Sequence, residues 1–217
     1  MNTTRCFPGR CQSTSADHAF LLHRPRRTRM HAQRDVVDGS HTIELLNAWP
    51  ERAHAVLMVV LHRSSEEPSS LREVLLTRCP RMRVEIARQG QVLVPGCCYI
   101  GRPDWPLTLL GDRSAFLVDG TKDRLRNRTV DALFASMARN IGERTAGIVL
   151  SGSLDDGSRG LAAIHAAGGL TMVLDPYQKP VGMQQNAIDF GGPVTFVGSA
   201  VEIAQMLDGL LPQRDRE

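Results

Sequence analysis

The segment from Gly147 to Pro176 constrains the fold more than any other part of the chain. It begins with a short apolar run, GIVL, of the kind that forms a buried strand. Apolar residues at helical spacing follow over 160–167, and Gly168-Gly169 can then stop a helix because glycine adopts positive φ without a steric penalty. A second apolar run ends at Asp175-Pro176. Strand, helix and strand within about thirty residues predict a βαβ unit with parallel strands.

The remaining sequence continues this alternation of strands and helices. The clearest buried strand is AVLMVVL, and the other apolar patterns predict strands at 84–87, 97–100 and 193–197 and helices over 43–49, 70–77, 130–141 and 201–211. Residues 177–185 are expected to form a loop. Two apolar runs, 107–110 and 114–118, predict a β-hairpin. The whole pattern predicts a doubly wound α/β fold: a mainly parallel sheet with helices on both faces and a β-hairpin addition.

Charge divides the chain into an arm and a folded part. Residues 1–34 contain seven arginines and one acidic residue, which gives a net charge of +6, whereas the remainder carries −3. We therefore expect a basic, disordered amino-terminal arm at 1–33, one folded domain over 34–212 and a tail at 213–217. The acidic balance of the folded part gives no reason to expect a nucleic-acid partner.

Composition also bears on compartment and cofactors. No run of about eighteen apolar residues is present, so membrane insertion is not expected, and residues 1–33 lack the pattern of a secretory signal. Five cysteines, an odd number, without such a signal indicate reduced thiols in the cytoplasm. Neither the cysteines nor the seven histidines show metal-ligand spacing, so we expect no metal and no cofactor.

Three polar residues follow three predicted strands. Ser40 follows a short strand at 35–37, His62 follows the AVLMVVL strand, and Asp156 follows GIVL. In open α/β sheets, ligands gather outside the carboxyl ends of the strands. A serine, a histidine and an aspartate that meet there could act as nucleophile, general base and orienting carboxylate.

Each of these residues also has a purely structural interpretation. Ser40 could be a helix N-cap, and so could Asp156 or its neighbour Asp155. His62 could be a hydrogen-bonded structural histidine. Three other histidines compete as the base, namely His41, His54 and His165. Local pattern alone leaves these alternatives open.

Several motifs together resemble one known family. Residues 150–157 (LSGSLDDG), followed by a predicted helix and Ala-Gly-Gly, resemble the catalytic domain of the CheB family, the chemotaxis protein-glutamate methylesterases. Shorter matches lie at 59–64 (VVLHRS), 94–100 (VPGCCYI), 127–134 (NRTVDALF) and 181–188 (VGMQQNAI). The resemblance runs from about Arg34 to Leu211, so it identifies the folded domain over 34–212 as a CheB-type methylesterase domain.

The resemblance implies a role for individual residues. It makes Ser40 the nucleophile and His62 the base, and it places the catalytic aspartate at Asp156 rather than Asp155. Backbone N–H groups near His41 and Ser153 would hold the oxyanion, and Met183 would lie in the substrate-binding loop. The family's Gly-Gly after the nucleophile is replaced here by His41-Thr42, which matters because glycines let the backbone turn tightly. Ser153 replaces a methionine, but a backbone donor survives that change.

By this resemblance, the chain is a soluble cytoplasmic hydrolase that removes methyl esters from glutamyl side chains of chemoreceptor-like proteins, with glutamine deamidation as a parallel reaction. The partner is a methylated receptor. Thirty-three residues are too few for a receiver domain, so control is expected from a separate response-regulator or methyltransferase protein, or from expression. One alternative is a non-catalytic domain that binds a receptor or signalling partner. Another is a nucleotide-binding module, which the lack of a glycine-rich phosphate loop disfavours.

Overall fold

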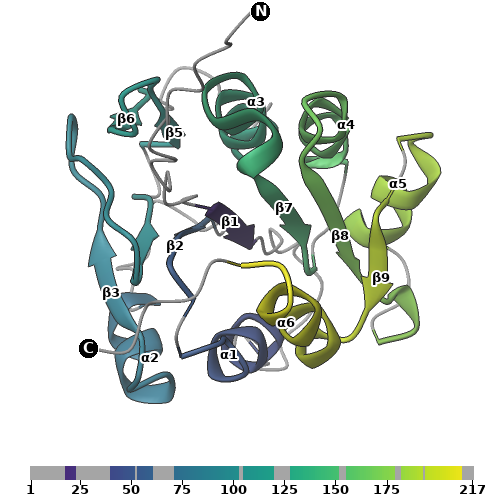
Figure 1. The fold of residues 1–217 in the computed structure, drawn as a ribbon, viewed down its shortest axis with the longest axis horizontal. Coiled ribbons are helices and arrows are strands. Elements are labelled where there is room, and N and C mark those ends of the chain that lie inside the picture. Colours follow the sequence, from purple (N-terminus) through teal and green to yellow (C-terminus); the bar gives the residue numbers. More distant parts are fainter. Residues whose placement is uncertain are drawn as a thin grey trace, which may run out of the picture.

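A computed structural model gives the fold of this chain (Figure 1). It describes the backbone of β1 and the residues that form the folded part, which are 18–22, 40–51, 53–60, 71–102, 105–119, 128–151, 155–178, 182–192 and 194–211. None of the described helices is long and apolar enough to cross a lipid bilayer.

Two parallel sheets form the centre of the fold. The first has the strand order β1-β2-β4-β3, with β1 at His18–Leu22, β2 at Ala55–Val59, β4 at Cys97–Ile100 and β3 at Arg83–Ile86. The second has the order β7-β8-β9, with β7 at Ala146–Val149, β8 at Leu170–Leu174 and β9 at Phe196–Gly198. Strand β1 contacts β7, so the two sheets meet there, as Figure 1 shows.

Helices cover both faces of this strand array. On one face lie α1 (Ser40–Asn47), α2 (Leu71–Arg78) and α6 (Ala200–Asp208), and on the other lie α3 (Thr129–Ile141), α4 (Ser158–Ala166) and α5 (Met183–Asp189). Short 3-10 turns follow α3 at Gly142–Arg144 and β8 at Pro176–Gln178. The predicted fold class, α/β with helices on both faces, is confirmed.

Strand β2 shows why both faces are covered. All five of its residues are buried. Leu57 and Val59 belong to the core under α1 and α6, whereas Val56 and Met58 belong to the core under α3 and α4. Because successive side chains of a strand point to opposite faces, a strand that is apolar throughout needs a layer on each side.

The predicted β-hairpin is also present. Strands β5 (Leu107–Leu109) and β6 (Ala115–Leu117) pair antiparallel. The hairpin lies against α3 through hydrogen bonds as well as apolar contacts. Asn140 donates to the carbonyl of Leu109 at 2.7 Å, and the Leu109 N–H donates to the Ser136 hydroxyl at 3.0 Å. The addition is therefore attached to the helix layer.

The amino-terminal segment differs from the prediction. Residues 18–22 form β1 and pair in parallel with β2, so the expectation of a disordered arm over the whole of 1–33 is wrong at these residues. Their sequence, HAFLL, is mostly apolar, and without β1 this edge of β2 would leave backbone N–H and C=O groups unpaired. The strand expected at 35–37 and the tail at 213–217 lie outside the described residues.

The loop expected at 177–185 also differs. Helix α5 begins at Met183, inside that range. Met183 and Ala187 are buried one helical turn apart against α4, while Gln185 and Asn186 between them are exposed. Tertiary contacts on one narrow face therefore stabilise a helix that is too short to stand out in the sequence.

The βαβ unit at 146–174 forms as predicted, with β7 and β8 parallel and α4 between them. Gly168 ends the helix region with φ of +82°. Gly169 serves a different purpose, because a Cβ there would lie 2.6 Å from the Thr145 carbonyl oxygen. That carbonyl accepts the Leu170 N–H at 2.8 Å, so the backbone approaches closely where β8 begins.

We expect Gly169→Ala to lower the free energy of unfolding by about 1–3 kcal/mol, because the new methyl group would meet a backbone carbonyl that is itself hydrogen-bonded. Gly209→Ala is the matched control, since Gly209 has φ of −75° and the nearest atom to its added Cβ would be 3.7 Å away. Urea denaturation followed by circular dichroism measures both variants. Equal stability of the two would contradict the steric account.

Candidate active site

Ser40 lies at the start of α1 and is half-buried. Helix α1 joins the parallel strands β1 and β2, so it runs back against them and begins at the edge where they end. Strands β1 and β7 lie together and point the same way in Figure 1, so Asp156, which follows β7, lies at this edge too. His62 and Ser153 lie outside the described residues. The meeting of Ser40, His62 and Asp156 stays a prediction.

Asp156 is a buried carboxylate that caps a helix remote from it in sequence. Its Oδ2 accepts the Val130 N–H at 3.1 Å, and its Oδ1 accepts the Asp131 N–H at 2.9 Å. These are first-turn N–H groups of α3, which have no partner inside the helix. The capping interpretation of Asp156 therefore holds, but for α3 and not for α4, the helix that follows it.

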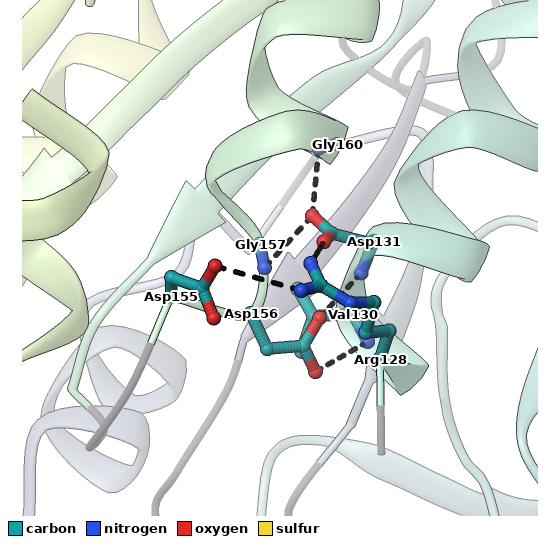
Figure 2. A network of polar contacts seen from close by, with 7 residues as sticks. All are labelled: Arg128, Val130, Asp131, Asp155, Asp156, Gly157 and Gly160. Carbon is teal, nitrogen blue, oxygen red and sulfur yellow. Dashed lines mark hydrogen bonds and ion pairs between the residues drawn. The ribbon is translucent and has the colours of Figure 1, made fainter. Parts of the chain in front are cut away.

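Asp131, which belongs to α3, in turn accepts N–H groups at the start of α4. Its Oδ1 accepts the N–H of Gly157 at 2.9 Å and the N–H of Gly160 at 2.8 Å, as Figure 2 shows. Asp156, in the turn before α4, thus caps α3, and Asp131, in the first turn of α3, caps α4. We call this arrangement, made by the carboxylates of Asp131 and Asp156, the reciprocal cap.

Arg128 adds positive charge beside the reciprocal cap. One guanidinium nitrogen lies 3.2 Å from Asp131 Oδ2, and the other lies 3.6 Å from Asp155 Oδ2. The contact with Asp155 is exposed on both sides, so its net contribution to stability is small. The contact with Asp131 involves a largely buried carboxylate, and it turns Oδ2 toward Arg128 while Oδ1 faces α4.

The pKa of Asp131 lies above its ordinary value. Burial is the main cause, because desolvation disfavours the charged form, and the negative charge of Asp156 raises the pKa further. The N–H groups of Gly160 and Gly157 and the guanidinium of Arg128 act in the opposite direction but do not outweigh burial.

Gly157 forms the turn between Asp156 and α4 and has φ of +99°. A Cβ at this position would lie 3.1 Å from Val130 Cγ1 and 3.3 Å from both Met183 Cε and Val149 Cγ2. Glycine is therefore needed here for its conformation and for its small size. The Met183 side chain is fully buried beneath this turn. Its part in substrate binding stays a prediction. From this position Met183 would affect the substrate indirectly, by supporting the turn.

The competing histidines occupy distinct places. His54 precedes β2, and His165 is exposed in the last turn of α4, so both lie at the opposite edge of the sheet from Asp156. His41 lies in the first turn of α1, and its Nδ1 is 3.3 Å from Glu44 Oε2. The geometry thus argues against His54 and His165 as the base that Asp156 would orient.

The sequence patterns do not predict a site role for Arg128 and Asp131, two residues of this network. The segment 127–134 contributes only to the family resemblance. Asp131 nevertheless has a local signal, because it is an acidic residue in the first turn of a predicted helix, where a carboxylate can accept backbone N–H groups. Among the described residues, His, Cys, Asp and Glu form no group of three or more that could hold a metal ion.

We expect Asp156→Ala to lower the free energy of unfolding by about 2 kcal/mol, because the N–H groups of Val130 and Asp131 lose their acceptor in a buried place. Asp156→Asn keeps one acceptor oxygen and is expected to lose less. Asp155→Ala is the control, since this neighbour is exposed and should change stability by about 0.5 kcal/mol or less. Urea denaturation provides the comparison, and an equal loss in the Asp155 variant would contradict the capping role.

The raised pKa of Asp131 predicts a pH dependence of stability. The folded state holds this proton more tightly than the unfolded state does, so stability falls as the pH rises from the ordinary aspartate pKa through the raised folded value. Asp131→Asn has no carboxyl group to titrate at this position. Between the ordinary and the raised pKa, we therefore expect the stability of wild type to fall relative to that of Asp131→Asn as the pH rises. Urea denaturation at a series of pH values tests it, and a difference that grows with pH in favour of wild type would contradict it.

Comparison with known proteins identifies the family to which this chain is similar. The family model described as CheB methylesterase matches residues 40–207. A protein-glutamate methylesterase/protein-glutamine glutaminase of Rhodopseudomonas palustris is 32% identical over 167 residues, which are 75% of this chain and 44% of that protein. A protein with the same description from Dechloromonas aromatica is 31% identical over 159 residues, covering 71% of this chain and 44% of that protein. This chain therefore spans less than half the length of these curated relatives.

The fold has a solved counterpart. The crystal structure of the Thermotoga maritima CheB methylesterase catalytic domain superimposes with a TM-score of 0.72 at 21% sequence identity, covering 91% of this chain and 100% of that one. The structural likeness shows a shared fold, and the family match covers both Ser40 and Asp156. The resemblance seen in the sequence is thereby confirmed: this chain belongs to the CheB methylesterase family.

Proposed function

We propose that this chain is a serine hydrolase that removes methyl esters from glutamyl side chains of chemoreceptor-like proteins. The observation that carries the proposal is the match of the CheB methylesterase family to residues 40–207. The two relatives named above are described as protein-glutamate methylesterase/protein-glutamine glutaminase, which favours ester hydrolysis and a parallel deamidation of glutamine.

Ser40, His62 and Asp156 carry the proposed chemistry. His62 takes the proton of the Ser40 hydroxyl as its oxygen attacks the ester carbonyl, and Asp156 orients the ring and stabilises its charged form. The tetrahedral intermediate collapses when His62 returns the proton to the leaving oxygen, and methanol departs. Water then attacks the acyl-enzyme by the same route and frees the glutamate. With a glutamine substrate, the leaving group is ammonia.

The arrangement around Asp156 supports this role. Both carboxylate oxygens receive an N–H group of α3, which holds the side chain in one position. A carboxylate has about four acceptor sites, so accepting two backbone N–H groups is compatible with orienting an imidazole. Preorganisation of this kind is what a triad requires of its acid.

The start of α1 supports the proposed oxyanion site near His41. First-turn N–H groups of a helix lack intrahelical partners and lie at the positive end of its dipole. Helix α1 begins at Ser40 even though His41-Thr42 replaces the family's Gly-Gly, and the side chain of Thr42 is buried beneath it. Together with a backbone donor near Ser153, these N–H groups would stabilise the developing oxyanion.

The proposed partner is a methylated receptor, and a separate response-regulator or methyltransferase protein is proposed to control the activity. We propose the cytoplasm as the site of the reaction. Among the described residues, Cys79, Cys97 and Cys98 are free and buried, which supports a reducing compartment. The alternative is a domain that binds a receptor or signalling partner without catalysis, and the altered turn after Ser40 is the observation that favours it.

Release of methanol from a methylated receptor tests the proposal. Ser40→Ala and His62→Ala are each expected to lower kcat by about a thousandfold or more, because a triad fails when one member is removed. His165→Ala is the control and should keep wild-type turnover, since His165 is exposed at the far end of α4.

Two results would overturn parts of this proposal. Undiminished turnover in Ser40→Ala would remove the serine mechanism. Receptor binding by wild type without methanol release, and without labelling of Ser40 by a serine-directed phosphonate, would favour the non-catalytic binding domain.

A further inference from the structure

We propose that Asp131 is a positioning residue for the candidate catalytic carboxylate of Asp156, acting through the reciprocal cap. This inference rests on the proposed function, because it assigns Asp131 a part in the same reaction. Asp131 itself would touch neither the substrate nor the histidine. It would set the geometry of the residue that orients the histidine.

The backbone of Asp131 contacts the carboxylate of Asp156. The Asp131 backbone N–H donates to Asp156 Oδ1 at 2.9 Å, and the adjacent Val130 N–H donates to Oδ2 at 3.1 Å. Two donors from consecutive residues of one helix hold both oxygens, so they fix the plane of the carboxylate as well as its place. A triad acid depends on that plane, because it decides where the imidazole N–H can be received.

Asp131 also holds the peptide that follows Asp156. Its Oδ1 accepts the Gly157 N–H at 2.9 Å, and this N–H belongs to the planar peptide unit that includes the Asp156 carbonyl. The same oxygen accepts the Gly160 N–H at 2.8 Å, so the attachment extends into the first turn of α4. One residue of α3 thus restrains both the side chain and the backbone of Asp156.

Helices α3 and α4 pack so closely that a Cβ on Gly160 would lie 2.4 Å from Phe134 Cβ. Arg128 contacts the other oxygen of Asp131 at 3.2 Å, which keeps Oδ1 directed at α4. Because the two helices are closely packed, a displacement of Asp131 would also displace Asp156.

The test measures kcat and KM for methanol release from methylated receptor, together with the Tm, in the full chain and three variants. Asp131→Ala removes the acceptor of Gly157 and Gly160, whereas Asp131→Asn keeps an amide oxygen at the same place. Asn140→Ala is the matched control on the same helix. It removes side-chain hydrogen bonds to the carbonyls of Leu109 and Ser136, nine residues along α3 from Asp131.

We expect Asp131→Ala to lower kcat by about tenfold to a hundredfold with KM within about twofold of wild type, since a misplaced catalytic group costs rate more than binding. Asp131→Asn should restore kcat to within about threefold of wild type. Asn140→Ala should lower the Tm while kcat stays at the wild-type value. Amide hydrogen exchange at Gly157 and Gly160 should be faster in Asp131→Ala than in Asn140→Ala.

A wild-type kcat in folded Asp131→Ala would overturn the inference, and so would an equal fall of kcat in Asn140→Ala at the same loss of Tm. If Asp131→Ala does not fold, Asp131→Ser provides the comparison, because its shorter side chain cannot reach both glycine N–H groups, and a wild-type kcat there would again overturn the inference. Absence of turnover in wild type would instead be a failure of the proposed function.

Discussion

The exchange of caps between α3 and α4 is the interaction on which the candidate site depends. A helix leaves four N–H groups without partners at its start, and a buried start must find acceptors elsewhere. Here Asp156 supplies them to α3 and Asp131 supplies them to α4. The arrangement places two buried carboxylates near one another, which disfavours their charged forms. Four backbone N–H groups and the Arg128 guanidinium offset part of that cost, but the pKa of Asp131 stays raised.

The parallel sheet explains why this exchange occurs at the candidate site. Strands that run parallel end at a common edge, and the helices that follow them begin there, so free helix N–H groups and strand-end side chains are collected in one region. Ser40 at the start of α1 and Asp156 after β7 are both products of this geometry. The structural role of Asp156 is therefore compatible with the catalytic role proposed for it.

By the resemblance seen in the sequence, the turn after Ser40 departs from the family pattern. Two glycines are replaced by His41 and Thr42, yet α1 still begins at Ser40. Thr42 is buried under the helix, and His41 is paired with Glu44 one turn later. Burial of the Thr42 side chain and the contact of His41 with Glu44 therefore accompany a helix start that has no glycine at these two positions.

The sequence by itself determined the fold class, the βαβ unit, the hairpin and the family. These features depend on apolar periodicity and on short motifs, which are local properties, and the tertiary contacts agree with them. Tertiary structure alone decided the pairing of HAFLL with β2, the helix at Met183 and the partners of Asp156. A capping pattern in sequence points to the helix that follows, and nothing local says that residue 156 will cap a helix that begins about 27 positions earlier. Such a contact exists only because the close packing of α3 on α4, at Gly160 and Phe134, brings the two helix starts together.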